Sequence, residues 1–357
     1  MSATMASAPQ GMPNGGMPPM GMATLGLGQA EPAPAPRLED VEALGARVVA
    51  VRQEVERVIF GQDEVVDQTL ITLLSGGHVL LVGVPGLGKT RLVQTLGTVL
   101  GLNTKRVQFT PDLMPADILG SEVLDETEGR RSFRFVPGPV FCQLLMADEI
   151  NRASPRTQSA LLQAMQEHRV AVGGVDHVLP SPFHVLATQN PIEQEGTYPL
   201  PEAQLDRFLL EVVVTYPELA AERTMLLATT GAEETHANPV LSAGELMAAQ
   251  ALIRRVPVGE KVVDAILSLV RGARPETAAD EIVAKHVAWG PGPRASQALM
   301  LASRARALLD GRLSPSIDDV IALARPVLRH RMALSFSARA DGVLLGDVID
   351  RLVARLG

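Results

Sequence analysis

The stretch Gly83-Val84-Pro85-Gly86-Leu87-Gly88-Lys89-Thr90 stands between a short apolar run, His78–Val82, and a segment of helical periodicity that opens at Lys89. It matches GxxxxGK[ST], a pattern in which glycines let the backbone fold around a phosphate with its N–H groups pointing inward. The lysine offers a positive charge to the β- and γ-phosphate oxygens, and the threonine hydroxyl can ligate Mg²⁺. Because the pattern lies between a strand and a helix, as a phosphate loop must, we expect a nucleotide site here.

Strands and helices alternate on both sides of this loop. Helical patterns at Lys89–Leu100 and Pro155–His168 separate short apolar or β-branched runs. The predicted strands are His78–Val82, Lys105–Gln108, Phe141–Ala147, His184–Thr188 and Phe208–Val214. This alternation is typical of an α/β fold with a parallel sheet, here of five strands, that helices cover on both faces.

Two insertions interrupt the alternation. Glu122–Val136 carries an acidic run that leads to a turn at Gly129, and Arg169–Leu179 alternates valines around Gly173-Gly174. A pair of glycines between two β-rich runs indicates a tight hairpin. We expect both insertions to be hairpins that protrude from the sheet.

Helical patterns precede the sheet at Leu38–Ile59 and Gln62–Leu74, and they replace the strands after Tyr216-Pro217. The later predicted helices are Glu218–Thr229, Ser242–Ile253, Gly259–Gly272, Pro293–Leu309, Ser314–Ala324 and Leu344–Leu356. For one of them Ser314 is the expected N-cap, with Pro315 in the first turn. We therefore place an α/β domain at 37–217 and a smaller, all-helical domain at 218–357.

Residues 1–36 differ from the rest of the chain. They hold six of the 13 methionines, seven prolines and a single charged residue, Glu31, with no helical or strand periodicity. Such a composition cannot bury enough apolar surface to fold alone, so we expect a disordered tail.

Composition excludes several classes of protein. The 357 residues carry a net charge of −8, which is a poor match to the phosphate backbone of nucleic acid. One cysteine, Cys142, allows no internal disulfide and favours a reducing compartment. The histidines and the cysteine show no zinc spacing, and no apolar run is long enough to span a membrane. We expect a cytoplasmic protein without a structural metal.

Charged and polar groups follow the predicted strands. Asp148 and Glu149 end an apolar strand 59 residues after Lys89, where one could hold Mg²⁺ and the other could polarise the attacking water. Asn190 follows the next strand and could orient that water. Arg207 precedes the last strand, and Arg294 opens a helix of the second domain. Taken singly, such arginines most often form structural ion pairs.

Several local strings resemble the AAA+ ATPases, and more narrowly the MoxR family, over about Leu38 to Gly357. They are Gly77-His-Val-Leu-Leu-Val-Gly-Val-Pro-Gly86, Phe109-Thr-Pro-Asp-Leu-Met-Pro-Ala-Asp117-Ile, Asp148-Glu-Ile-Asn-Arg-Ala153, Ala187-Thr-Gln-Asn-Pro191, Leu200-Pro-Glu-Ala-Gln-Leu-Asp-Arg-Phe208 and Val327-Leu-Arg-His-Arg331. One departure is Gly88, where the family often has alanine, and it leaves the phosphate cradle intact.

The resemblance implies a role for each candidate residue. The phosphate loop is Walker A, Asp148 and Glu149 are Walker B, Asn190 is sensor 1, Arg207 is an arginine finger that reaches a neighbouring subunit, and Arg294 is sensor 2. Arg152 and Arg156 are alternatives to Arg207 that the sequence does not separate. The implied nucleotide contacts are Phe60, Gly61, Gly83, Val84, Pro85, Gly86, Leu87, Gly88, Lys89, Thr90 and Arg91, and the implied Mg²⁺ ligands are Thr90 and Asp148.

The resemblance also implies a hexameric ring that hydrolyses ATP to remodel or mature client proteins, including metal-cofactor insertion, with a von Willebrand factor A partner. The two hairpins correspond to insertions that relatives of this clade direct toward the ring pore. The alternative is a nucleic-acid motor or loader, which the acidic net charge disfavours. A third reading is a scaffold that binds nucleotide without cleaving it.

Overall fold

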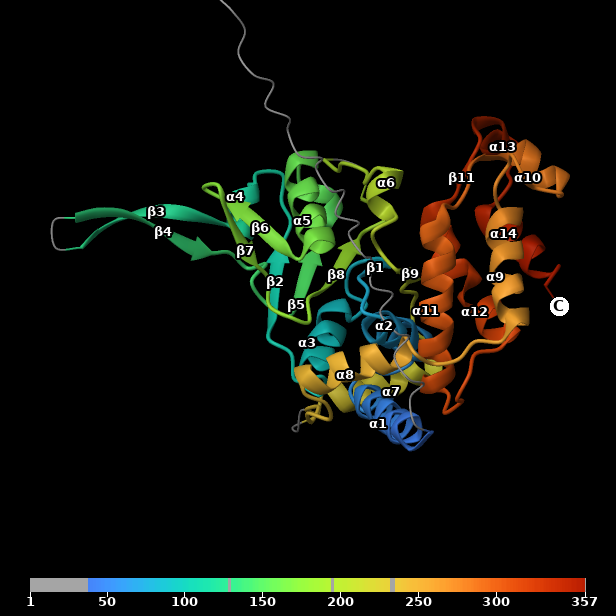
Figure 1. Ribbon diagram of the computed structural model, residues 1–357, viewed down its shortest axis with the longest axis horizontal. Coiled ribbons are helices and arrows are strands. Elements are labelled where there is room, and N and C mark those ends of the chain that lie inside the picture. Colours follow the sequence, from blue (N-terminus) through green and yellow to red (C-terminus); the bar gives the residue numbers. More distant parts are fainter. Residues whose placement is uncertain (1–37, 128–129, 194–195, 232–234, 357) are drawn as a thin grey trace, which may run out of the picture. The chain divides into compact units, whose positions relative to one another are not determined.

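The computed structural model describes residues 38–127, 130–193, 196–231 and 235–356, which belong to one compact unit (Figure 1). The predicted tail and the turn predicted at Gly129 lie outside these ranges. Within the ranges, every helix is too short or too polar to cross a lipid bilayer.

A five-stranded sheet forms the centre of the fold, in the order β2-β5-β8-β1-β9 with every pairing parallel. The strands are β1 (Val79–Val82), β2 (Thr104–Gln108), β5 (Leu144–Asp148), β8 (His184–Gln189) and β9 (Leu210–Val213). Each overlaps the apolar run that predicted it, and the α/β fold class is confirmed. Because the strands are parallel, their carboxyl ends share one edge, where ligands of such sheets bind.

Helices cover both faces of this sheet, as its uninterrupted apolar strands predict. Leu144 and Met146 of β5 join a core with α1 (Leu38–Glu56), α2 (Asp63–Leu74) and α3 (Lys89–Val99). The alternate residues of β5, Leu145 and Ala147, point to the other face and join a second core with α4 (Pro115–Leu119) and α5 (Pro155–Glu167). This alternation fixes the register, since a slip of one residue would exchange the two sets of side chains.

The C-terminal region consists mainly of helices, as predicted. They are α7 (Leu219–Thr229), α8 (Ala243–Ile253), α9 (Glu260–Gly272), α10 (Glu281–His286), α11 (Pro293–Leu309), α12 (Ile317–Leu328), α13 (Phe336–Ala340) and α14 (Leu345–Val353). One predicted helix start is wrong: α12 begins after Ser316, because Ser316 and Asp319 form a capping box that Ser314 cannot form. The prediction that the region is all-helical is wrong in one place, because it also holds a short antiparallel pair, β10 (Val287–Trp289) and β11 (Ala333–Leu334).

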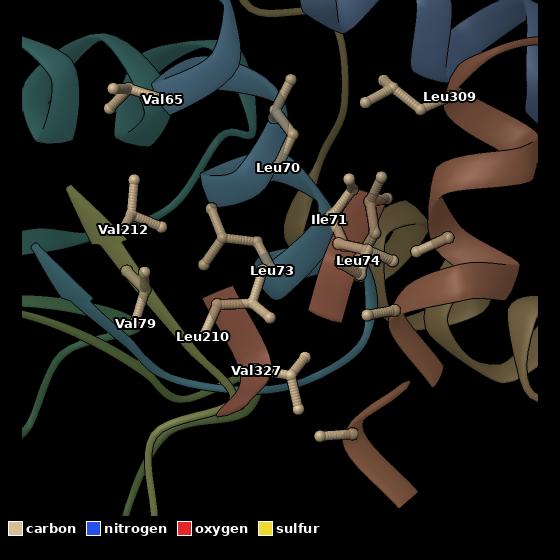
Figure 2. Close-up of a cluster of buried hydrophobic side chains, with 14 of the residues drawn as sticks. Val65, Leu70, Ile71, Leu73, Leu74, Val79, Leu210, Val212, Leu309 and Val327 are labelled. Carbon is tan, nitrogen blue, oxygen red and sulfur yellow. The ribbon is translucent and has the colours of Figure 1, made fainter. Parts of the chain in front are cut away.

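The C-terminal helices share a hydrophobic core with the sheet. Figure 2 shows side chains of α2 between Leu210 of β9 and residues of α11 and α12, such as Leu309 and Val327. Leu70 and Leu73 of α2 are fully buried there. Truncating either to alanine should cost about 2–5 kcal/mol of unfolding free energy, since cavities of this kind collapse only partly.

Both insertions form hairpins. The longer pairs β3 (Gly120–Thr127) with β4 (Arg130–Pro137) and extends away from the sheet (Figure 1), and the shorter pairs β6 (Arg169–Val172) with β7 (Val175–Val178). The shorter one turns at Gly173 and Gly174, whose φ angles of 59° and 81° suit glycine. The two hairpins meet where the ring of Phe135 stacks on that of His177, with centroids 3.8 Å apart.

Candidate active site

The phosphate loop joins β1 to α3, and its shape depends on glycine. Gly86 and Gly88 have φ angles of 86° and 74°, a left-handed conformation that side chains rarely adopt. Gly83 lies so close to β9 that a Cβ atom would come within 2.6 Å of the Val214 carbonyl oxygen. The Gln62 side chain, which precedes α2, donates a hydrogen bond to the Leu87 carbonyl at 2.9 Å and ties the loop to that helix.

Lys89 begins α3 and is half-buried beneath the loop. Its ammonium group donates to the Gly83 carbonyl oxygen at 2.5 Å. Burial lowers the pKa of Lys89, while the charges of Asp148 and Glu149 oppose that shift. An ammonium group held against the loop backbone, in a cavity that the loop also lines, is placed to meet a phosphate charge.

Asp148 is the last residue of β5, and its carboxylate is fixed from two sides. Oδ1 accepts a hydrogen bond from the Thr188 hydroxyl at 2.6 Å, and Oδ2 accepts one from the Arg106 guanidinium at 2.6 Å. The Thr188 hydroxyl in turn accepts from the backbone N–H of Glu149 at 2.8 Å. One buried threonine on β8 therefore positions both acidic residues.

Glu149, the next residue, has a left-handed backbone, with φ at 55°. Its Oε2 accepts hydrogen bonds from Gln108 at 2.8 Å and from Arg152 at 3.1 Å. The two carboxylates therefore have different hydrogen-bond partners within one cavity. The left-handed backbone conformation costs a non-glycine residue about 1–3 kcal/mol of folding free energy, and residues strained in this way cluster at functional sites.

These groups surround one cavity of about 280 Å³ at the carboxyl edge of the sheet. Its lining joins the loop residues from Pro85 to Thr90 with Arg106, Gln108, Asp148, Glu149 and Asn190. Thr90 and Asp148 bring a hydroxyl and a carboxylate to the same space, which is the oxygen donor set that Mg²⁺ takes alongside phosphates. The described residues hold no cluster of three or more histidine, cysteine or acidic side chains for another metal.

A second cavity, of about 270 Å³, shares the residues from Pro85 to Gly88 with the first. Phe60 and Arg91 line it, together with Val58, Tyr216 and Met225. Gly61 packs against α7, where a Cβ atom would lie 2.2 Å from that of Ala221. An apolar cavity next to a phosphate site suits a nucleobase.

Arg207 and Arg294 do not line either cavity. They share a third, of about 250 Å³, with Gly77 and His78, which precede β1, and with Asp206 and Arg331. An Arg294 nitrogen lies 3.5 Å from Oδ2 of Asp206, and burial together with the charge of Arg294 lowers the pKa of Arg207. These arginines therefore lie at the amino ends of β1 and β9, at the edge opposite the phosphate loop.

The alternatives to Arg207 differ in their surroundings. Arg152 contacts Glu149 of its own chain and lies 3.8 Å from Glu193. Arg156, in the first turn of α5, is exposed.

Sequence reasoning missed three residues of the site: Arg106, Gln108 and Thr188. All lie in β2 or β8, the neighbours of β5 on its two sides. Polar side chains near the carboxyl ends of apolar strands are the signal that could have identified them, because these ends meet at one edge.

Comparison with known proteins agrees with this geometry. A family model described as "ATPase family associated with various cellular activities (AAA)" matches residues 78–210, and one described as "AAA lid domain" matches residues 279–352. The chain is 43% identical over 337 residues to "Chaperone MoxR1" of Mycobacterium tuberculosis, covering 93% of this chain and 89% of that protein. It is 33% identical over 312 residues to "Protein MoxR" of Paracoccus denitrificans, covering 78% and 86%.

One solved structure is similar to this chain over most of the length of both. The crystal structure of a candidate ATPase from Cytophaga hutchinsonii superposes with a TM-score of 0.82 at 35% identity, covering 88% of this chain and 96% of that one. The similarity extends across both the sheet and the helical region, well beyond the phosphate loop. The chain belongs to the MoxR family of AAA+ ATPases.

Proposed function

We propose that this protein binds ATP with Mg²⁺ and hydrolyses it to ADP and phosphate in a hexameric ring, using the energy to remodel client proteins. The observation that carries the proposal is the single cavity that unites Lys89, Thr90, Asp148, Glu149 and Asn190. A merely similar glycine-rich turn would have no reason to meet two acids and an amide from other strands.

Each residue of the cavity has a distinct task. Lys89 and the loop N–H groups hold the β- and γ-phosphates, while Thr90 and Asp148 hold Mg²⁺, which when bound offsets charge on the phosphate oxygens. Glu149 polarises the attacking water, and Asn190 orients it. Gln108 and Arg152 donate hydrogen bonds to Oε2 of Glu149 and so hold that carboxylate in place.

Completion of the site requires a second subunit in this proposal. Arg207 and Arg294 lie at the opposite edge of the sheet from the phosphate loop. If they act on a nucleotide, that nucleotide belongs to a neighbouring chain, with Arg207 as the finger and Arg294 as its companion. A contact between two different surfaces of identical subunits closes into a ring when the rotation allows it.

The proposed output is chaperone-like remodelling, with metal-cofactor insertion as one form of it and a von Willebrand factor A protein as the partner. Its support is the relative named "Chaperone MoxR1" and the long hairpin. Leu124 and Phe133 face each other across that hairpin and are 52% and 72% exposed, so they offer apolar surface to a client.

Hydrolysis and assembly can be tested together. Purified protein should release phosphate from MgATP only in fractions that light scattering identifies as rings. A Glu149→Gln protein should hold ATP and keep the client bound, so that a pull-down identifies it. Phosphate release by monomers at the same rate would overturn the ring requirement, and DNA-stimulated turnover would favour a nucleic-acid motor.

A further inference from the structure

Arg331 is the largest side chain that the described fold buries almost completely, with 2% of its surface exposed. It lies in the short 3₁₀ helix Arg329–Arg331 that follows α12. A buried arginine is costly unless its charge and its five N–H donors find partners. What those partners are therefore indicates why the residue is there.

Almost all of them belong to the segment around Arg207. Nε donates to the Asp206 carboxylate at 2.8 Å, and the two terminal nitrogens donate to the carbonyl oxygens of Phe208 at 2.6 Å and Leu209 at 3.0 Å. A further bond, at 2.7 Å, returns to Val327 in α12. The guanidinium thus holds the residue before Arg207 and the two residues after it.

Neighbouring groups strengthen this attachment. His330 donates through Nε2 to the same Phe208 carbonyl at 3.0 Å, and Phe208 is fully buried. Asp206 offers its other oxygen to Arg294 at 3.5 Å. The Arg207 side chain is left to line the cavity while the backbone on both sides of it is held.

We propose that Arg331 is a positioning residue: it fixes residues 206–209 so that Arg207 is presented to the nucleotide of the neighbouring subunit. The inference rests on the trans role proposed for Arg207. Lysine could keep the charge near Asp206, but its single ammonium cannot reproduce the planar fork that reaches both the carboxylate and the carbonyls. Arg331 would then act on a neighbour's hydrolysis without affecting ATP binding in its own subunit.

The test uses full-length Arg331→Lys in subunit-mixing assays, with Arg312→Lys as a matched control. Arg312 likewise donates to a carboxylate, that of the almost fully buried Asp319, at 2.7 Å, but this ion pair lies inside the helical region. Arg331→Lys should bind ATP with the affinity of the unaltered protein. Its kcat should be about 100-fold lower, which is the usual effect of a misplaced catalytic group. Arg312→Lys should keep its kcat even if its melting temperature falls.

Mixing distinguishes positioning from general damage. Arg331→Lys mixed with Lys89→Ala should regain turnover, because one variant has an intact pocket and the other an intact finger. Mixed with Arg207→Ala it should regain none, because both then lack a working finger. Loss of turnover without recovery against Lys89→Ala, or an unchanged kcat, overturns the proposal.

The same assay separates the positioning role of Arg331 from the trans role of Arg207 on which it rests. If Arg207→Ala recovers with Lys89→Ala and Arg331→Lys does not, only the positioning role fails. If Arg207→Ala itself does not recover, the trans role fails and the positioning role with it. Should Arg331→Lys not fold, Asp206→Asn keeps the side-chain shape, weakens the same attachment and must give the same pattern of recovery.

Discussion

The cavities at the two edges of the central sheet differ in net charge: Lys89 and Arg106 balance two acids at the carboxyl edge, whereas arginines predominate at the amino edge. At the carboxyl edge, Lys89 lies near Asp148 and Glu149, and hydrogen bonds within the chain hold both acids. At the amino edge, Arg207, Arg294 and Arg331 line one cavity, and among the described residues lining it only Asp206 is a carboxylate. In the proposed function, the carboxyl edge binds a nucleotide by itself, whereas the amino edge offers its excess of positive charge to the nucleotide of a neighbouring chain.

The largest effect should come from removing the charge at the carboxyl edge. Lys89→Ala should abolish ATP binding, because the loop loses the ammonium that meets the β- and γ-phosphates. Titration calorimetry with MgATP measures this. Lys261→Ala, which changes an exposed lysine of α9, should bind normally. Retained affinity in Lys89→Ala would mean that the nucleotide lies elsewhere.

The amino edge should affect rate and leave binding intact. Arg207→Ala should bind ATP normally and lose roughly 10³–10⁵ in kcat, the usual contribution of an arginine finger. Phosphate release at saturating MgATP measures the loss. A mixture with Lys89→Ala should recover activity at the mixed interfaces. No recovery at any ratio would move the finger to Arg152 or Arg156.

Glu149→Gln should lower kcat by about 10²–10⁴, the range for a general base, while ATP remains bound. Single-turnover phosphate release and nucleotide retention after gel filtration give the two quantities. Glu260→Gln, at an exposed position of α9, is the control and should hydrolyse ATP normally. A Glu149→Gln protein with full turnover would show that Glu149 is not the general base, whereas the scaffold requires that the unaltered protein bind ATP without releasing phosphate.

The two edges also differ in how much of them the sequence predicts. The residues of the carboxyl edge each lie at or just after the end of a predicted strand: the loop directly follows β1, Asp148 ends β5 and Asn190 follows β8. Because the predicted sheet is parallel, these ends are expected at one edge. The amino edge has no such signal. Arg207, Arg294 and Arg331 are far apart in the chain, and only the packing of α11 and α12 against the sheet brings them to one cavity.

Other differences have similar causes. The capping box of Ser316 and Asp319 sets the start of α12. The preference of serine for the N-cap position, taken alone, does not distinguish Ser314 from Ser316. Gln108 and Thr188 look like ordinary strand residues, because their role depends on which strand lies beside β5. Strand order is a tertiary property that alternation of helices and strands leaves open.

A smaller effect should follow from Thr188→Val at the carboxyl edge. The hydroxyl is fully buried, donates to Oδ1 of Asp148 and accepts from the Glu149 N–H, so its removal takes this partner from that oxygen and from that N–H. The expected loss is about 1–3 kcal/mol of unfolding free energy, measured by urea denaturation. Thr188→Ser keeps the hydroxyl and should restore most of it. Equal stability of the valine and serine variants would show that the bonds contribute little.

The smallest effect concerns two histidines at the amino edge. Burial lowers the pKa of His78 to about 3 and that of His184 to about 4, with the charge of His184 adding to the shift at His78. In the unfolded chain a histidine titrates near pH ~6.5, so the stability contribution is complete above that pH. As pH falls further, the unfolded state takes up protons that the folded state refuses, and stability decreases.

As the pH falls from 6.5 to 5.5, protonation of each of the two histidines in the unfolded chain should therefore lower the free energy of unfolding by about 1 kcal/mol. Urea denaturation of the parent and of His184→Gln at these two pH values measures the difference. The variant should be less stable at both, because it alters the bonds to Gly77 and Gln250, but its pH dependence should be smaller by about 1 kcal/mol. His177→Gln, which removes a histidine from the β6–β7 hairpin, is the control for the loss of a histidine away from this edge. If His184→Gln kept the full pH dependence, the carboxyl edge or the rest of the chain would have to supply it, since glutamine does not titrate.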